Sequence, residues 1–300
     1  MSRERVWRVP EGAPDALGRV LERMEVDAES ALAAGRVFVD GVRAVDASTA
    51  VVPGGVVCVF DARPVVGEAF VVDRAQGFVA AFKPPELPTE PDRAGSDSLT
   101  RRLAQALGVP ALHAESRLDV GVSGIVLLSE SAGARQWAAS LRERHALSRE
   151  YLGVCARPPE PERGRWQGRV DGKPAESRYH RLARAAPATA PRGEPLTPAL
   201  VLLCPDTGRK HQLRVHAAAA GAPLLGDRRY GGPTRIVRGT GDVVEIPRPL
   251  LHAFRIELSL PDGTSWCPAA PVPDDFVSVW VALGGARQDL TVSSPARPGT

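Results

Sequence analysis

The segment with the clearest chemical potential is 113–129, which reads HAESRLDVGVSGIVLLS. Its residues 125–128 form a short apolar run directly after Gly124, and such a run predicts a buried strand. Asp119 lies in the polar loop that enters this strand, two residues after Arg117. An ionised carboxylate in that place can act as a nucleophile, although an Arg-Leu-Asp triplet alone is more often a turn or a surface ion pair. Asp119 is therefore a candidate nucleophile that the rest of the chain has to support.

Three further side chains stand where predicted elements begin or end. Lys83 follows a strand predicted over 78–82 and precedes two prolines, which end the strand and fix the backbone. Tyr151 either packs in the core or contacts a nucleobase, by stacking of its ring and hydrogen bonding of its hydroxyl. Arg214 lies in the first turns of a helix predicted over 211–220. A guanidinium at a helix N-terminus suits an anion, which is either a phosphate or the carboxylate of Asp119.

Three segments resemble the motifs of the RluA-type RNA pseudouridine synthases, and they occur in the family's order. Arg117-Leu118-Asp119, followed by Ser123-Gly124 and the apolar strand, resembles the catalytic motif. Residues 82–85 (FKPP) resemble the lysine-proline motif, and residues 208–230 resemble the long third motif. The resemblance implies an α+β fold, the pseudouridine synthase fold, with a central, largely antiparallel mixed sheet flanked by helices and loops.

The resemblance also implies roles for single residues. Asp119 would be the catalytic nucleophile, Arg214 its ionic partner, and Tyr151 the side chain that supports the freed base. Tyr151 stands in the sequence REYLG, which resembles the family's Lys-x-Tyr-x-Ala motif with Arg149 and Gly153 as substitutions. The reaction that the resemblance implies, isomerisation of uridine to pseudouridine, involves no net oxidation or reduction, so no cofactor is expected.

The distribution of charge favours a partner lined with phosphates. The chain carries a net charge of +3, yet residues 1–66 hold 8 basic and 10 acidic side chains, so the remainder carries +5. Residues 163–184 contain 7 basic and 2 acidic side chains, and residues 208–238 contain 7 and 1. Such clusters suit RNA, although a solvated cationic face has the same composition. The side chains expected to bind the substrate are Lys83, Arg117, Arg209, Lys210 and His211.

Residues 1–66 are predicted to form a small module of two helices and a β-hairpin. Asp27 can cap the second helix, and Asp40-Gly41 predicts the turn of the hairpin. The arrangement resembles the alpha-L RNA-binding module that often precedes this catalytic domain. Its second helix carries Asp27 and Glu29 where that module usually has basic residues. The module is therefore expected either to bind RNA or only to pack against the catalytic domain.

Residues 67–283 are assigned to the catalytic domain and residues 284–300 to a disordered tail rich in Gly, Pro, Ser and Arg. Within the domain, residues 184–198 lack periodicity and predict a flexible loop or an insertion. Helical or strand patterns occur at residues 69–73, 78–82, 99–107, 132–145, 178–183, 200–204, 211–220 and 250–260.

The composition describes a globular chain, with 43% apolar and 24% charged residues among 300. No apolar run approaches the roughly 20 residues of a membrane helix, and the N-terminus lacks an apolar signal core, so a cytoplasmic protein is expected. It is also expected to be a monomer. The four cysteines are far apart, which indicates reduced thiols. His211, His216 and His252 offer no convincing metal-ligand spacing, so no metal is expected.

Three functions of different classes remain open from the sequence. The first is isomerisation of uridine to pseudouridine in a stem-loop of ribosomal or transfer RNA. The second is an RNA-binding or chaperone protein that keeps the fold without catalysis, because Ser116 stands where the family usually has a histidine. The third is a nucleoside hydrolase or glycosidase that uses Glu115 and Asp119 as paired carboxylates. The joint presence of Asp119, Tyr151 and Arg214 favours the first function.

Overall fold

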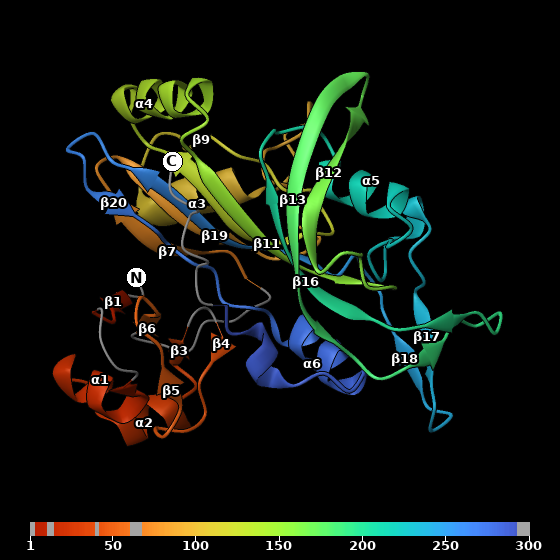
Figure 1. The fold of residues 1–300 in the computed structure, drawn as a ribbon. Helices are drawn as coiled ribbons and strands as arrows, with labels where there is room; N and C mark the ends of the chain where they lie inside the picture. Colours follow the sequence, from red (N-terminus) through yellow and green to blue (C-terminus); the bar gives the residue numbers. More distant parts are fainter. Residues whose placement is uncertain (1–3, 11–14, 40–41, 61–67, 293–300) are drawn as a thin grey trace.

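A ten-stranded mixed sheet forms the centre of the molecule (Figure 1). The computed structural model describes residues 4–10, 15–39, 42–60 and 68–292. The main path of the sheet runs in the order β12-β13-β16-β11-β19-β10-β8-β7, with β20 paired to β19 and β9 paired to β10. Neighbouring strands are antiparallel except for β10 and β19, which are parallel. The strands are β7 (Phe70–Ala75), β8 (Phe78–Lys83), β9 (His113–Ala114), β10 (Ser123–Ser129), β11 (Ser148–Cys155), β12 (Arg163–Val170), β13 (Lys173–Arg184), β16 (Ala199–Pro205), β19 (Leu251–Ser259) and β20 (Ser265–Trp266).

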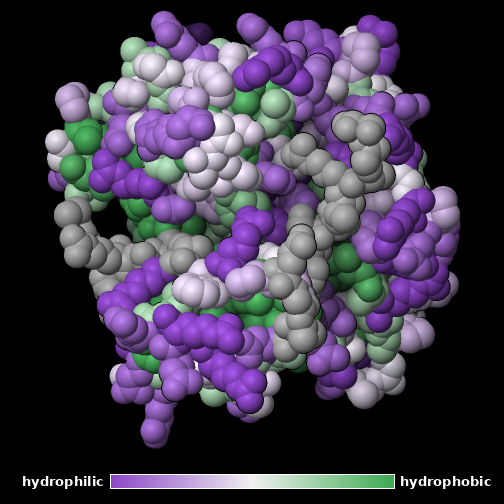
Figure 2. Space-filling model, turned by 60° about the vertical axis from the view of Figure 1, so that its left-hand side comes forward, coloured by the Kyte–Doolittle hydropathy of each residue, from purple (hydrophilic) through white to green (hydrophobic). Residues whose placement is uncertain are grey.

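Helices cover both faces of this sheet. Buried side chains of α3 (Leu99–Leu107), α4 (Ala132–Glu143) and α5 (Gln212–Ala219) belong to one hydrophobic cluster, whereas those of α6 (Asp274–Ala282) belong to the cluster on the other face. Strands β8 and β10 are buried at every residue, and their apolar side chains belong to the first of these clusters. On the face drawn in Figure 2, hydrophilic side chains predominate and hydrophobic ones show mainly in the recesses.

The helices and strands predicted from local patterns are largely confirmed. Helix α3 begins at the cap Ser98 and ends at Gly108, which adopts the left-handed conformation with φ 66°. Helix α5 occupies most of the predicted range 211–220. Helix α6 has no counterpart among the predicted elements.

Residues 184–198, predicted as a flexible loop, contain two short strands. These are β14 (Ala188–Thr189) and β15 (Pro195–Leu196), which form a four-stranded sheet with β17 (Arg235–Arg238) and β18 (Val243–Glu245). The partner strand β17 is distant in sequence, so local periodicity gives no sign of this sheet. Leu196 and Ile236 are buried in the second hydrophobic cluster, which explains why the segment is ordered.

The prediction of a disordered tail from residue 284 is wrong for residues 284–292. A short 3₁₀ helix, η2 (Arg287–Leu290), follows α6, and Leu290 and Val292 are buried against it. The Trp280 indole donates a hydrogen bond to the Ala286 carbonyl (3.1 Å), which holds the turn on the helix. Residues 293–300 lie outside the described part of the chain.

Residues 4–60 form a sheet and a hydrophobic cluster of their own. The sheet order is β1-β6-β3-β4, and β2 pairs with β5. Asp27 caps the second helix by accepting the Ser30 N–H (3.3 Å), as predicted. The predicted hairpin strands pair with each other, while their turn and the linker at 61–67 lie outside the described residues. The elements are β1 (Glu4–Arg8), β2 (Asp15–Ala16), α1 (Leu17–Arg23), α2 (Ala28–Ala33), β3 (Val37–Val39), β4 (Val42–Arg43), β5 (Ala50–Val51) and β6 (Val56–Phe60).

A line of aromatic rings connects this N-terminal unit to the large sheet. Phe38 contacts Phe60 edge to face at 5.4 Å between ring centroids, and Phe60 contacts Phe70 of β7 at 5.9 Å. Phe70 in turn stacks on Phe82 of β8 at 4.9 Å. The sheet of the N-terminal unit therefore packs on the large sheet through aromatic side chains.

Candidate active site

One row of residues across the sheet determines where the chemically active side chains lie. Gly124 of β10 is paired with Lys83 of β8 on one side and with Ala253 of β19 on the other. Ala253 is paired in turn with Tyr151 of β11. Since neighbouring strands are about 4.8 Å apart, Tyr151 lies only about 10 Å from Gly124 along this row. The loop that carries Asp119 enters β10 at the end where this row lies.

Gly124 permits this close arrangement. Its φ is +123°, and a Cβ atom there would lie 2.1 Å from the Ala253 carbonyl oxygen. Only glycine accepts that conformation and that contact. The first residues of β10 can therefore lie directly against β19.

Asp119 presents a carboxylate that is partly open to solvent. Its side chain is 25% exposed, and its backbone carbonyl accepts the Val122 N–H (3.0 Å), which forms the turn into β10. Arg214 Nη1 donates a 2.8 Å hydrogen bond to Oδ2, and His211 Nε2 lies 3.5 Å from Oδ1. The predicted pairing of Arg214 with Asp119 is confirmed. The carboxylate is thus oriented by a charge-assisted bond and still accessible.

A second carboxylate holds the remaining side of the Arg214 guanidinium. Asp227 accepts hydrogen bonds from Nε (2.7 Å) and from Nη2 (2.8 Å). The Tyr230 ring lies 5.1 Å from the guanidinium carbon. Although burial acts in the opposite direction, the hydrogen bonds that Arg214 donates to Asp227 and Asp119 raise the pKa of Arg214. Arg214 is therefore a cation whose Nε, Nη1 and Nη2 each donate to a carboxylate.

His211 occupies a left-handed backbone position (φ 57°) directly before α5. Its Nδ1 is 2.8 Å from the Tyr230 hydroxyl. Burial lowers the pKa of His211 despite the opposing charge of Asp119. A neutral ring that accepts the Tyr230 O–H at Nδ1 carries its proton on Nε2, facing Asp119.

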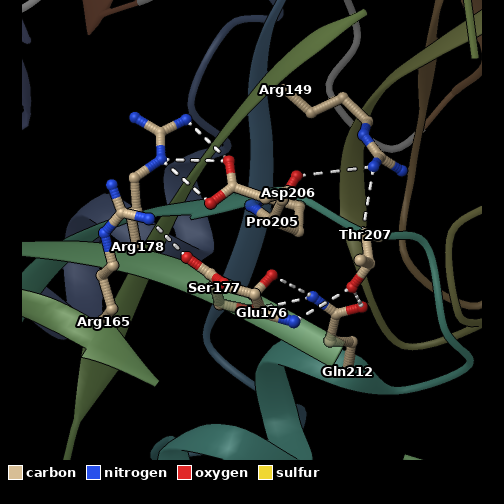
Figure 3. A network of polar contacts seen from close by, with 9 residues as sticks. All are labelled: Arg149, Arg165, Glu176, Ser177, Arg178, Pro205, Asp206, Thr207 and Gln212. Atoms are coloured by element: carbon tan, nitrogen blue, oxygen red, sulfur yellow. Dashed lines mark hydrogen bonds and ion pairs between the residues drawn. The ribbon is translucent and has the colours of Figure 1, made fainter. Parts of the chain in front are cut away.

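The start of α5 is fixed by a buried glutamine (Figure 3). Gln212 donates to the Glu176 carbonyl (2.8 Å) and the Ser177 hydroxyl (2.9 Å) of β13 and accepts from the Thr207 hydroxyl (2.7 Å). Arg149, which lies two residues before Tyr151 on β11, donates a hydrogen bond to the Thr207 carbonyl (3.2 Å). The network binds α5 to the strands on both sides of β16, so Arg214 is held on a rigid element.

Tyr151 shares the electrostatic environment of Asp119. Its side chain is 9% exposed and belongs to the hydrophobic cluster on the α5 face of the sheet. Burial raises the pKa of the Tyr151 hydroxyl, and the negative charge of Asp119 adds to this effect. The side chain is therefore a neutral, protonated phenol on which the charge of Asp119 acts.

Comparisons with known proteins decide what this arrangement is. Residues 77–219 match a family described as RNA pseudouridylate synthase. The dual-specificity RNA pseudouridine synthase RluA of Salmonella typhimurium is 32% identical over 213 residues, which cover 65% of this chain and 88% of that protein. The chain belongs to the RluA-type RNA pseudouridine synthases. It is an isomerase that converts uridine to pseudouridine in RNA.

Two further comparisons show how much of the chain resembles known pseudouridine synthases. The ribosomal large subunit pseudouridine synthase D of Nitrosomonas europaea is 29% identical over 217 residues, 67% of this chain and 59% of that protein. The solved structure of human RNA pseudouridylate synthase domain containing 4 superposes with a TM-score of 0.54 at 21% identity, covering 71% of this chain and 92% of that one. That structure supports the predicted pseudouridine synthase fold.

Lys83 does not have the position expected of a substrate-binding residue in this synthase. Its side chain is fully buried, and its ammonium donates to the carbonyls of Pro84 (2.9 Å), Leu87 (2.8 Å) and Val120 (3.2 Å). Burial lowers the pKa of Lys83 to about 7. The lysine therefore ties the 83–87 turn to the loop beside Asp119 and cannot reach RNA.

The other side chains expected to bind substrate differ in their exposure and in the contacts that they already make. The Arg117 side chain is 75% exposed and lies 3.7 Å from Glu90, which is a weak surface pair. Lys210 is exposed, whereas Arg209 donates to the Pro174 carbonyl (3.3 Å). Arg117 and Lys210 are thus available to a phosphate, and Arg209 is partly engaged.

Glu115 does not form a carboxylate pair with Asp119. Its buried side chain accepts hydrogen bonds from Arg142 (2.6 Å) and Ser129 (2.7 Å), beside the far end of β10. The hydrolase hypothesis needs two carboxylates on one substrate, and this geometry contradicts it. Ser116 accepts the Leu127 N–H (3.1 Å), so its hydroxyl also serves the strand.

Two side chains that contact Arg214 were not predicted from the sequence. Asp227 and Tyr230 lie within the segment 208–230 that resembles the third motif, and no local pattern reveals that they contact Arg214. Across the described ranges, no group of three or more His, Cys, Asp or Glu side chains could hold a metal ion, and no helix there is long and apolar enough to cross a membrane. All four cysteines are free thiols.

Proposed function

We propose that this synthase isomerises a uridine in a stem-loop of ribosomal or transfer RNA, with Asp119 as the nucleophile. The observation that supports this role is the state of its carboxylate. It is 25% exposed and oriented by one N–H of a buried arginine. The position leaves Asp119 charged, directed and accessible, as a nucleophile requires.

The chemistry divides among three side chains. The bond between the ribose C1′ and uracil N1 breaks, a bond from C1′ to the ring carbon C5 forms, the C5 proton leaves, and N1 takes up a proton. Asp119 supplies the electron pair for attack, at either the ribose or the ring. Arg214 orients the carboxylate and balances its negative charge through a charge-assisted hydrogen bond. Tyr151 offers its ring to the freed base, which must stay bound while it turns over.

The target uridine has to leave its base stack to reach Asp119. Extrusion of a base costs a few kcal/mol and is least costly in loops, which favours a stem-loop substrate. Exposed basic side chains near the site can hold the flanking phosphates, among them Arg117 and Lys210. The β12–β13 ribbon, which projects beyond the rest of the sheet in Figure 1, adds exposed Arg163 and Arg169.

We also propose that residues 1–66 are a separate module that packs on the catalytic unit and contributes little RNA binding. The acidic α2 and the aromatic contact between Phe60 and Phe70 support this assignment. The catalytic unit then begins near residue 67 and extends to residue 292, because Leu290 and Val292 pack on α6.

Mapping pseudouridine in the source cell tests the proposed function. Carbodiimide-based mapping of ribosomal and transfer RNA is compared between a strain that lacks the gene and strains complemented with wild type or Asp119→Asn. We expect at least one site to vanish in the deletion strain and to return only with wild type. Return of the site with Asp119→Asn would exclude Asp119 as nucleophile. No change at any site would favour an RNA-binding protein without catalysis on these RNAs.

A further inference from the structure

The Arg214 guanidinium is shared unequally between two carboxylates. Asp227 is 1% exposed and takes two parallel hydrogen bonds, from Nε and Nη2, at 2.7 and 2.8 Å. Asp119 is 25% exposed and takes one, from Nη1, at 2.8 Å. The paired geometry is the stronger way for an arginine to bind a carboxylate, and it is given to the residue that cannot reach a substrate.

The backbone fixes Asp227 in that position. Gly226 has φ +76°, and a Cβ there would lie 1.8 Å from the Arg248 carbonyl oxygen. A Cβ on Gly232 would lie 1.8 Å from the Leu224 carbonyl oxygen, and the Gly232 N–H donates to the Asp227 carbonyl (2.8 Å). Both close approaches need glycine, so the turn has little freedom to move Asp227 away from Arg214.

The same turn restrains the guanidinium from its flat side. The Tyr230 ring lies 5.1 Å from the Arg214 guanidinium carbon, and its hydroxyl is bound to His211. Rotation of the guanidinium would break both the hydrogen bonds to Asp227 and this ring contact. Arg214 is therefore presented to Asp119 in one orientation only.

We propose that Asp227 is a positioning residue of the reaction: it occupies the two-pronged side of Arg214, so that the arginine donates only one N–H to Asp119, at Oδ2, and leaves Oδ1 with only the longer contact to His211 (3.5 Å). This inference rests on the proposed role of Asp119 as nucleophile. Without Asp227, the guanidinium can turn its prongs onto Asp119 and engage both oxygens. A carboxylate held in that way is a poorer nucleophile, because its lone pairs are tied up in two charge-assisted hydrogen bonds.

Asp227 also keeps the arginine paired when Asp119 changes charge. Formation of a bond from Asp119 to the substrate removes the negative charge that faces Nη1. Arg214 then stays neutralised by Asp227, so no unpaired cation is left in a buried place. The site can pass through the covalent stage with little rearrangement.

A double-mutant cycle between Asp227 and Arg214 tests the proposal. The variants are Asp227→Asn, Arg214→Lys and the two together, in the full chain. Release of tritium from [5-³H]uridine-labelled total RNA of the deletion strain is followed at excess enzyme. This gives the maximal rate and the enzyme concentration at half-maximal rate. We expect Asp227→Asn to lower the maximal rate by about 30-fold, with the half-maximal concentration changed less than about threefold.

The cycle separates positioning from folding. A lysine cannot form the two-pronged contact, so the added loss from Asp227→Asn in the Arg214→Lys background should be less than about threefold. Glu115→Gln is the matched control, because it removes another buried carboxylate that pairs with an arginine, away from Asp119. We expect that control to keep the wild-type rate. Additive losses in the cycle would overturn the proposal, as would an equal loss in Glu115→Gln.

A crystal structure of Asp227→Asn gives a readout that does not depend on activity. The guanidinium of Arg214 should rotate and place two N–H groups on Asp119. An unrotated guanidinium with one N–H on Asp119 would contradict the inference even if the RNA assay detected nothing. Retained activity of Asp119→Asn would instead refute the proposed nucleophile, which keeps the two failures apart.

Discussion

Two groups of polar and charged side chains contact the 119–123 loop, and they differ in whether a carboxylate stays open to solvent. The site cluster consists of Asp119, His211, Arg214, Asp227 and Tyr230. The anchor cluster consists of Lys83, Arg248, His252 and Asp275. The site cluster ends in a carboxylate that meets solvent, whereas the anchor cluster binds the loop backbone and the Ser123 hydroxyl.

The comparison is sharp because both clusters contain the same arginine–aspartate geometry. Arg248 donates to Asp275 from Nε (2.6 Å) and Nη2 (2.9 Å), as Arg214 does to Asp227. The third prong of Arg248 faces the carbonyls of Gly121 (3.5 Å) and Pro249 (3.3 Å). The same ion-pair geometry therefore supports a candidate nucleophile in one place and a backbone turn in the other. The difference lies in the acceptor of Nη1, which is the Asp119 carboxylate for Arg214 and backbone carbonyls for Arg248.

Loss of the nucleophile should have the largest effect and fall on activity alone. Asp119→Asn is expected to lower tritium release more than about 1,000-fold, because no other described carboxylate contacts Arg214 from the open side. The free energy of unfolding should change by less than about 1 kcal/mol, since Asp227 keeps Arg214 paired. Urea unfolding measures this free energy, and filter binding measures whether the variant still binds RNA. A large loss of stability would mean that the site cluster is also an anchor.

Loss of the buried lysine should act mainly on stability. Lys83→Met leaves three carbonyl groups without their donor, and we expect the free energy of unfolding to fall by about 3 kcal/mol. Lys173→Met, at an exposed lysine of β13, should leave that free energy within about 0.5 kcal/mol of wild type. Equal stability of the two variants in urea would show that Lys83 anchors nothing.

Breaking the arginine pair of the anchor cluster should cost less. Arg248 is 5% exposed, but the side chain of Asp275 is 44% exposed, so water can replace part of the lost contact. Asp275→Asn is expected to lower the free energy of unfolding by about 2 kcal/mol. Asp227→Asn, whose aspartate is fully buried, should lower it at least as much in the same urea titration. A larger loss from Asp275→Asn would reverse the order that burial predicts.

The smallest effect concerns pH and the buried imidazole of the anchor cluster. Burial lowers the pKa of His252 from 6.5 to about 3, while its Nδ1 accepts from the Ser123 hydroxyl at 3.0 Å. Between these values the unfolded chain binds a proton that the folded chain does not, so stability falls as the pH falls below 6.5. The contribution is at most about 1.4 kcal/mol per pH unit.

The slope between pH 6.5 and 5 isolates this term from the acidic groups that titrate lower. Urea unfolding of wild type should show a steeper loss than His252→Gln over that window. Identical slopes would place the titration on other histidines, since burial also lowers the pKa of His216.

Local sequence patterns predicted the parts of this fold that are built from near neighbours. The capped helices α2 and α3 and the strand β10 follow from spacing and from residues such as Asp27 and Gly108. The β14–β17 pairing joins segments that lie far apart in the chain, and Leu290 is ordered by contact with α6. Composition therefore misread both segments as flexible.

The same division holds for the active site. The residue types around Asp119, Tyr151 and Arg214 were enough to indicate a uridine isomerase by resemblance. The burial of Lys83 and the pairing of Glu115 with Arg142 were not, because each depends on a partner chosen by the fold.

By itself the sequence determined the family, most regular elements and the candidate nucleophile, since these depend on residue type and short spacing. The tertiary structure alone decided that Asp227 forms an ion pair with Arg214 and that the Lys83 ammonium donates a hydrogen bond to the Val120 carbonyl. A carboxylate or an ammonium carries the same charge wherever it stands. Whether it reacts, orients a neighbour or holds a backbone turn depends on burial and on the direction of its hydrogen bonds, which only the folded chain fixes.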